Sequence, residues 1–164
     1  MKELFLIRHA KAESQITVND MNRNLSETGK KEASLIGEFL KINFFSPQII
    51  SSPAKRAMET AVIISEKINL PKESISYDNI LYNIDPESLI KYISQISDKL
   101  NSVAIIGHNP TFEETLSIFL NHSCISMPTG AIALLSSGSN SWCDFRKKSQ
   151  LDFFIHPGLV KNLF

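Results

Sequence analysis

The sequence lacks the features that would tie it to a membrane or to nucleic acid, and it is poor in cysteine. No window offers the ~18 consecutive apolar residues that a membrane-spanning helix needs. Lys and Arg together number 17, as do Asp and Glu, so no net positive charge recruits nucleic acid or a membrane surface. The two cysteines, Cys124 and Cys143, are expected to be buried thiols rather than a disulfide. Any binding of an anion must therefore depend on a few local residues.

A secretion signal is also missing at the start of the chain. The first residues contain no basic segment, long apolar run or small-residue cleavage site, so we expect a cytoplasmic protein. We find no internal repeat, low-complexity segment or linker. The 164 residues are long enough for one sizeable core, and residues 1–164 are expected to form a single domain.

Two apolar runs each end in a histidine. Leu4–Ile7 is followed by Arg8 and His9, and Val103–Ile106 leads through a glycine to His108. Runs of this kind are typical of strands buried on both faces. Because ligands bind at the carboxyl ends of strands in an open α/β sheet, we expect these side chains to meet at one solvent-facing edge.

A third segment brings another arginine to the same edge. A short apolar strand at 49–50 precedes Ser52 and Pro53, which are expected to cap and start a helix. Arg56 then lies about one turn into this helix, near its positive end, where an anion is favoured. Two imidazoles and two guanidiniums at one edge predict a site for an anion.

The rest of the chain alternates strand and helix. Lys11–Asn24 is expected to be a loop, and Ser26 should cap a helix from Glu27 to Asn43. Two further helices are predicted, with Asp85 and Asn109 as their caps. Three further strands are predicted: one at Ala131–Leu135 and two antiparallel edge strands at Trp142–Phe145 and Leu151–Ile155. This order favours an α/β fold: a three-layer α/β/α sandwich whose mostly parallel sheet gains strands at its carboxyl-terminal edge.

Three motifs, in this order and spacing, resemble the histidine phosphatase superfamily. They are Arg8-His9-Ala10, Ser52-Pro53-x-x-Arg56-Ala57-x-x-Thr60-Ala61 and Gly107-His108-Asn109-Pro110. The third position is usually Gly in the superfamily and is Ala10 here, which keeps a small side chain. The short chain is similar to the SixA-like phosphohistidine phosphatase branch. This resemblance implies a phosphoglycerate mutase-like fold without a cap domain, because residues 78–84 leave no room for one.

The resemblance also implies roles for the matched residues. His9 would be the nucleophile, attacking phosphorus as a neutral imidazole, while Arg8, Arg56 and a charged His108 would complete the catalytic set by binding phosphoryl oxygens. The segment Asp20–Ser26 resembles an Asp-x-x-Arg-Pro-Leu-Thr pattern, with Asn24 in place of Pro and Ser26 in place of Thr. Arg23 would then bind the phosphate too. Asn109 is expected to contact the substrate, whereas His122 and His156 are expected to be structural.

No metal or other cofactor is expected. The sequence has no His-x-x-x-His pair of the kind common in hydrolase zinc sites, and converging arginines would repel a cation. Only Asp85 and Glu87 lie where related enzymes on alkyl phosphates carry a general acid. Phosphohistidine needs less help from such an acid, because its protonated ring is a better leaving group.

These features predict a cofactor-independent phosphatase with a covalent phosphohistidine intermediate. Its expected substrate is a protein carrying phosphohistidine. The open site suits a macromolecule or a small substrate held mainly by its phosphoryl group. Two alternatives remain: a small-molecule phosphomonoesterase of the same superfamily, acting on a small phosphate ester, and a non-catalytic phosphate-binding module. All three would hold phosphate or sulfate between the arginines and histidines.

Overall fold

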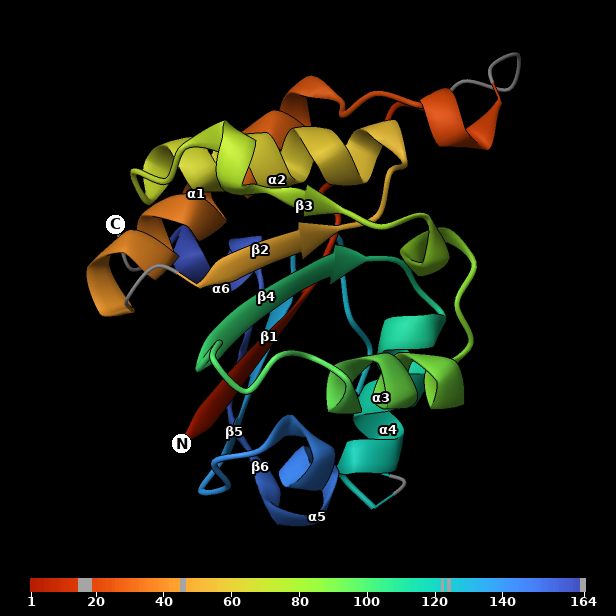
Figure 1. Ribbon diagram of the computed structural model, residues 1–164. Helices are drawn as coiled ribbons and strands as arrows, with labels where there is room; N and C mark the ends of the chain where they lie inside the picture. Colours follow the sequence, from red (N-terminus) through yellow and green to blue (C-terminus); the bar gives the residue numbers. More distant parts are fainter. Residues whose placement is uncertain (15–18, 45–46, 122, 124, 163–164) are drawn as a thin grey trace.

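A mixed β-sheet forms the centre of the computed structural model, which describes residues 1–14, 19–44, 47–121, 123 and 125–162 (Figure 1). Its strands are β1 (Lys2–Arg8), β2 (Gln48–Ser51), β3 (Ser76–Tyr77), β4 (Ser102–Gly107), β5 (Ile132–Ser137) and β6 (Ser149–Ile155). The strand order is β3-β2-β4-β1-β5-β6. The first four strands in that order pair in parallel, and β5 runs antiparallel to both β1 and β6. The expected sheet, with added strands at its carboxyl-terminal edge, is confirmed.

Helices cover both faces of this sheet (Figure 1). One layer holds α1 (Glu27–Asn43), α2 (Lys55–Lys67) and α6 (Pro157–Val160), and the other holds α3 (Pro86–Ser94), α4 (Thr111–Phe119) and α5 (Phe145–Lys148). Single turns of 3-10 helix occur at Asp20–Asn22, Lys72–Ser74, Asn79–Tyr82 and Trp142–Asp144. The fold is therefore the three-layer α/β/α sandwich that the sequence predicts.

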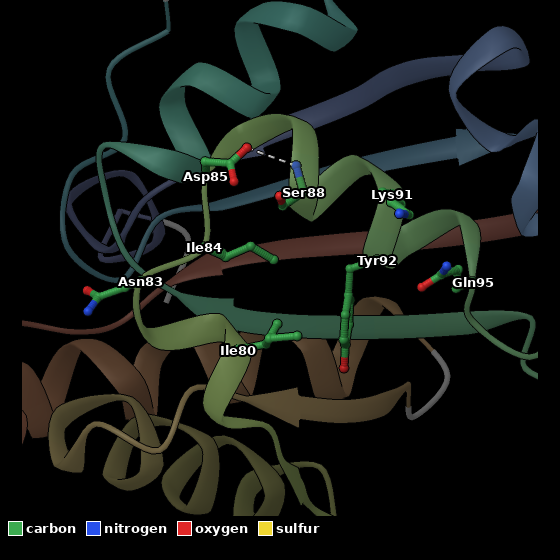
Figure 2. Close-up of a pocket in the computed structure, with 8 residues that line it drawn as sticks. All are labelled: Ile80, Asn83, Ile84, Asp85, Ser88, Lys91, Tyr92 and Gln95. Atoms are coloured by element: carbon green, nitrogen blue, oxygen red, sulfur yellow. Dashed lines mark hydrogen bonds between the residues drawn. The ribbon is translucent and has the colours of Figure 1, made fainter.

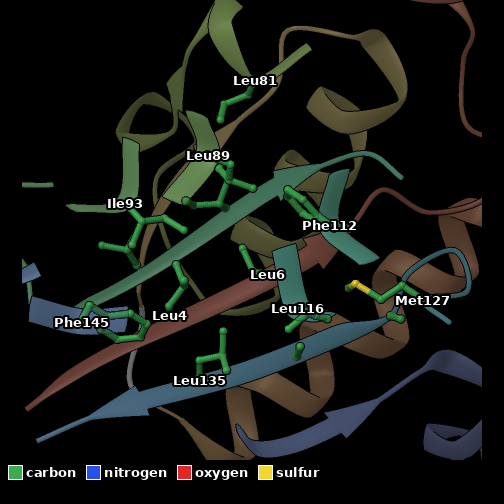
Figure 3. Close-up of a cluster of buried hydrophobic side chains, with 14 of the residues drawn as sticks. Leu4, Leu6, Leu81, Leu89, Ile93, Phe112, Leu116, Met127, Leu135 and Phe145 are labelled. Atoms are coloured by element: carbon green, nitrogen blue, oxygen red, sulfur yellow. The ribbon is translucent and has the colours of Figure 1, made fainter. Parts of the chain in front are cut away.

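Strand β1 is buried on both faces, as its apolar run predicts. Leu4 and Leu6 belong to the core cluster on the side of α3 and α4, which Figure 3 shows in close-up. Phe5 and Ile7 belong to the cluster under α1 and α2. All four side chains are fully buried, and burying each contributes about 1.5–3 kcal/mol to stability. The strand that carries the site is thus held from both sides.

Of the four helix caps predicted from the sequence, two are confirmed and two are wrong. Ser26 and Asp85 cap α1 and α3 as predicted, each accepting a backbone N–H three residues on, at 3.1 and 3.0 Å. The prediction for Ser52 is wrong, because α2 begins only at Lys55 and the Ser52 hydroxyl lies against His108. The prediction for Asn109 as a cap is also wrong, since its side-chain amide donates to a backbone carbonyl across the site.

The segment Trp142–Phe145 is helical rather than an edge strand. Asp98 accepts the Trp142 backbone N–H at 2.8 Å, and the Trp142 indole N–H donates to the Leu100 carbonyl at 2.8 Å. The indole is fully buried, so it fills the core instead of lining a sheet edge. The other predicted edge piece is confirmed within β6. Cys143 is exposed rather than buried, and Cys124 and His122 lie outside the described residues.

The topology places a crevice at the carboxyl ends of β1 and β4. These strands are neighbours, and the chain leaves β1 toward the layer of α1 but leaves β4 toward the layer of α4 (Figure 1). Ligands bind at such points in open α/β sheets. Between β3 and α3 the chain forms only the turn Asn79–Tyr82, so this fully described connection contains no cap domain. Within the described ranges, no helix is long and apolar enough to cross a membrane.

Candidate active site

The two predicted catalytic histidines lie side by side at the carboxyl edge of the sheet. His9 follows β1 and His108 follows β4, with ring centroids 5.0 Å apart. The parallel register pairs Arg8 with Gly107, and the His9 backbone N–H donates to the Gly107 carbonyl at 3.0 Å. Neighbouring parallel strands therefore bring together residues that are 99 positions apart in the sequence.

The His9 ring is fixed in one orientation. Its Nδ1 lies 2.8 Å from the Ala10 carbonyl, a contact that requires the proton on Nδ1 and leaves the lone pair on Nε2. The Arg56 Nε donates to this Nε2 at 3.1 Å. His9 is 7% exposed. It is therefore buried, whereas the sequence analysis predicted a solvent-facing side chain. The ring thus presents its unprotonated nitrogen to the arginine.

Both histidines are neutral at neutral pH. Burial lowers the pKa of His9 to about 4; the Ala10 carbonyl opposes this shift, and the charges of nearby arginines add to it. Burial also lowers the pKa of His108 to about 3, with contributions from His9 and Arg56. His9 is therefore in the form that can act as a nucleophile. The charge on His108 is expected only beside a bound phosphate, which would have to raise this pKa.

Arg56 contacts both histidines of the site. Its guanidinium donates from Nε to His9, and its Nη2 lies 3.2 Å from His108 Nδ1. The side chain is 6% exposed and comes from the first turn of α2. Thr60, one turn further along, donates its hydroxyl to the Arg56 carbonyl at 2.7 Å and accepts the Ala10 backbone N–H at 3.1 Å. Thr60 therefore ties this helix to the segment after β1.

Ser52 holds the second histidine. Its hydroxyl lies 2.8 Å from His108 Nε2. A neutral ring that accepts from Arg56 at Nδ1 must carry its proton on Nε2, so His108 donates to Ser52. The sequence contains the signal, because Ser52 belongs to the second motif, but it was interpreted as a helix cap. The Tyr82 ring lies edge-on to His108, with centroids 5.8 Å apart.

The Met127 carbonyl orients two further predicted residues. Arg8 Nη1 donates to it at 2.7 Å and Asn109 Nδ2 at 3.0 Å. The Met127 backbone N–H in turn donates to Glu113 at 2.6 Å. Burial lowers the pKa of Arg8 from its usual value, with Glu113 opposing that shift. Arg8 and Asn109 are thus fixed against the same wall of the site.

All six predicted site residues line one pocket of about 350 Å³: Arg8, His9, Arg23, Arg56, His108 and Asn109. Three residues that the sequence analysis did not assign also line it: Asp20, Tyr82 and Asn83. Asp20 is the first residue of the Asp-x-x-Arg pattern, so the pattern was the available signal. Tyr82 and Asn83 belong to the turn before α3, and no motif points to them.

The Asp20 carboxylate binds several of the cationic groups of the pocket. One oxygen accepts from Arg56 Nη2 at 2.9 Å and from the Tyr82 hydroxyl at 2.9 Å, and the other accepts from Arg23 Nε at 3.0 Å. The Asp20 backbone carbonyl also accepts from Arg56 Nη1 at 2.6 Å. Arg23 is held near the site by this carboxylate.

The two carboxylates considered as general acids lie outside this pocket. Asp85 caps α3, and its oxygen accepts the Ser88 backbone N–H at 3.0 Å. Glu87 faces Arg146 at 3.7 Å. Asp85 instead lines a neighbouring groove of about 410 Å³ (Figure 2). The groove is lined by Ile80, Asn83, Ile84, Asp85, Ser88, Lys91, Tyr92 and Gln95.

This groove lies beside the pocket that holds His9 and His108, because Asn83 lines both. Figure 2 shows that its walls come from the turn before α3 and from α3 itself. Among the residues that the structure describes, no group of three or more His, Cys, Asp or Glu could hold a metal ion. The pocket is instead rich in arginine, which suits an anion.

Comparison with known proteins places the chain in a family. The model of the histidine phosphatase superfamily (branch 1) matches residues 4–85, half of the chain. The protein belongs to the histidine phosphatase superfamily. The expected superfamily is thereby confirmed.

Individual relatives agree with this assignment. An uncharacterized protein of Mycobacterium leprae is 32% identical over 125 residues, 76% of this chain and 65% of that protein, so the match spans slightly less than two thirds of the relative. The candidate phosphohistidine phosphatase SixA from Agrobacterium tumefaciens has a TM-score of 0.79 and 28% identity, covering 95% of this chain and 99% of that chain. The protein histidine phosphatase SixA complexed with tungstate has a TM-score of 0.82 and 22% identity, covering 96% and 99%. The predicted likeness to SixA proteins is therefore confirmed, with the fold.

Proposed function

We propose that this protein is a cofactor-independent phosphatase that removes the phosphoryl group from protein phosphohistidine, with His9 as the covalent acceptor. The observation that carries the proposal is the neutral His9, whose Nδ1 is fixed on the Ala10 carbonyl and whose Nε2 lies 3.1 Å from Arg56. A nucleophilic nitrogen next to an oxyanion-binding guanidinium is the arrangement that phosphoryl transfer to a histidine needs.

The reaction proceeds in two displacements. The Nε2 lone pair attacks phosphorus and forms a new N–P bond, while the N–P bond of the substrate breaks. Its electrons stay on the leaving imidazole, which is neutral because its other nitrogen already carries a proton. Water then attacks the phosphoryl group of the intermediate, and the N–P bond breaks with its electrons returning to Nε2. The protons of the water stay on phosphate oxygens, and inorganic phosphate and neutral His9 are released. Arg8, Arg23 and Arg56 neutralise the phosphoryl oxygens in both steps.

His108 gains a role once phosphate is bound. A phosphoryl dianion in the pocket favours the charged form of a nearby imidazole, so it raises the low pKa of His108. The protonated ring then donates a hydrogen bond to a phosphoryl oxygen. Ser52 keeps the ring in the required orientation from its other nitrogen.

Two observations support a macromolecular substrate. The connection between β3 and α3 carries no cap domain, and the groove beside the pocket would accept polypeptide that flanks the phosphorylated residue. Asp85 and Glu87 lie outside the pocket, and inside it, against the effect of burial, Tyr82 and the arginines lower the pKa of the Asp20 carboxylate and keep it ionised. This favours a substrate that needs little proton donation. Protein phosphohistidine meets both conditions.

A substrate panel tests the proposal. A phosphohistidine domain, phosphoserine and phosphoaspartate proteins, p-nitrophenyl phosphate and a sugar phosphate are compared at equal concentration. We expect the highest kcat/KM for phosphohistidine, an acid-labile label on His9 and no label in His9→Ala, which should also lose turnover. Faster turnover of the small esters would favour a phosphomonoesterase. Phosphate binding without label would favour a non-catalytic module.

The role of the groove has its own test. Ile80 is 58% exposed at the groove, and Leu159 is 48% exposed on α6, away from it. Ile80→Ser should lower kcat/KM for a phosphohistidine protein and leave p-nitrophenyl phosphate unaffected. Leu159→Ser is the matched control and should change neither. Equal losses on both substrates with Ile80→Ser would argue against docking of the flanking polypeptide.

A further inference from the structure

The Asp20 carboxylate occupies the donors that a phosphoryl group would use. Arg56 donates from Nη2 to the carboxylate and from Nη1 to the Asp20 backbone carbonyl, at 2.9 and 2.6 Å. Arg23 donates from Nε to the second carboxylate oxygen at 3.0 Å. With its Nε on His9, Arg56 has all three nitrogens engaged. An incoming phosphoryl group therefore meets an arginine that already holds an anion.

This internal anion is ionised and can leave. Burial alone would raise the pKa of Asp20, but the Tyr82 hydrogen bond and the charges of Arg56 and Arg23 outweigh it and lower the pKa below its usual range. The Asp20 side chain is 52% exposed, whereas that of Arg56 is 6% exposed. The carboxylate can be rehydrated where it lies, while the buried guanidinium must keep a partner.

The exchange favours a phosphoryl group over weaker anions. A carboxylate offers two oxygens and one negative charge, and a phosphoryl group offers three oxygens and up to two charges. Another monoanion gains nothing by replacing Asp20. A dianion gains charge neutralisation at both arginines and bonds to Arg8 and His108 as well.

We propose that Asp20 is a specificity-determining internal anion, which competes with ligands for Arg56 and Arg23 and returns to displace the product phosphate. The inference rests on the proposed function only in that a phosphoryl group binds this pocket. Asp20 acts by weakening phosphate binding. A residue that merely positioned the arginines would strengthen it, so the sign of the effect distinguishes the two roles.

The test measures binding of inorganic phosphate and of tungstate by calorimetry. Asp20→Asn keeps the size of the side chain and removes its charge, and it should bind both oxyanions at least about tenfold more tightly than the parent, a change of about 1.4 kcal/mol. Weaker or unchanged binding would overturn the proposal. Phosphate binding is read without turnover, so the result is independent of whether phosphohistidine is hydrolysed.

Two controls sharpen this measurement. Glu87→Gln removes the same charge from a side chain that is 70% exposed and faces Arg146, and it should leave phosphate affinity unchanged. An equal gain in this variant would show a general field effect and overturn the proposal. Asp20→Ala should also bind phosphate more tightly, and added acetate should restore the parental affinity by replacing the missing carboxylate. Failure of acetate to compete there would contradict the assignment.

Discussion

At the scale of single residues, one guanidinium connects the groups of the site. Arg56 contacts His9, His108 and Asp20 at once, and Ser52 extends this set of contacts from the far side of His108. Hydrogen bonds in a buried network strengthen one another, so the loss of one partner affects the others. Small side chains at the edge of the network should therefore influence catalysis.

Replacing Ser52 tests this influence. Ser52→Ala removes the hydroxyl that accepts from His108, and a single hydrogen bond contributes about 0.5–1.5 kcal/mol. We expect kcat/KM to fall by about 2–10-fold, with the folded structure retained. Ser51→Ala is the matched control, because Ser51 is equally buried but donates to the Ser52 carbonyl instead of touching His108. Equal losses in the two variants would contradict a specific role for Ser52.

The low pKa values of the two histidines predict how stability depends on pH. Unfolded histidine titrates near pH 6.5, whereas the pKa is about 4 for folded His9 and about 3 for folded His108. Between these values the unfolded chain binds protons that the folded protein does not, so the free energy of unfolding falls as the pH is lowered. We expect a slope approaching about 1.4 kcal/mol per pH unit for each histidine.

Urea unfolding between pH 6 and pH 5 measures this slope above the range of the carboxylates. Glutamine does not titrate, so His108→Gln should reduce the slope by roughly the contribution of one histidine, up to about 1.4 kcal/mol per pH unit. A free energy of unfolding that did not change over this interval would show that both rings keep ordinary pKa values.

The sequence predicted which residues line the pocket well and their supporting contacts poorly, for a physical reason. His9, Arg56 and His108 follow apolar runs or open a helix, and such positions can be recognised locally. Asp20 and Tyr82 meet only because two loops, 62 positions apart, approach over the sheet edge. No period or propensity in the sequence encodes that approach.

At the scale of elements, tertiary contacts override two local capping rules. Ser52 and Asn109 have side chains suited to cap a helix, yet they bond to His108 and to the Met127 carbonyl. The two helices begin later than predicted, at Lys55 and Thr111. Ser26 caps α1 although its hydroxyl also donates to the Lys11 carbonyl. Ser52 accepts the Ala54 backbone N–H at 3.3 Å beside its bond to His108, because a hydroxyl carries one donor and two acceptor lone pairs.

The start of α1 depends on one close approach. A Cβ at Gly29 would collide with the backbone of Lys11, whose carbonyl already accepts from the Ser26 N–H and hydroxyl at 2.9 and 3.0 Å. We expect Gly29→Ala to lower the free energy of unfolding by about 1–3 kcal/mol, the usual cost of overpacking. Urea titration compares it with Gly138→Ala, where an added Cβ meets no atom within 4 Å. Equal stabilities would argue against this packing.

At the scale of the whole molecule, ligand binding and folding should be coupled through the pocket. Tungstate at a hundredfold excess over its Kd should stabilise the folded state by about 2.7 kcal/mol and raise Tm by several degrees. EDTA should change neither Tm nor activity, because binding depends on arginines. Differential scanning fluorimetry measures Tm with tungstate and with EDTA, and a phosphatase assay measures activity. His156→Ala is the control variant, because His156 lies outside the pocket. Activity lost with EDTA and regained with zinc would contradict the metal-free mechanism.

The architecture could be predicted because alternating strands and helices favour a mostly parallel sheet with helices on both faces. The exception at Trp142–Phe145 arose because its partners, Asp98 and Leu100, lie more than 40 residues away in the sequence. A single domain over residues 1–164 and a cytoplasmic location stay predictions.

The central position of β1 has a consequence during synthesis on the ribosome. This strand leaves the ribosome before its two pairing partners, β4 and β5, which lie at Ser102–Gly107 and Ile132–Ser137. At ordinary elongation rates, about 5–20 s pass before the first partner has been made. During that interval the two rows of backbone groups in β1 lack their native strand partners. The nascent chain is therefore exposed to aggregation and to chaperones at the segment that carries His9.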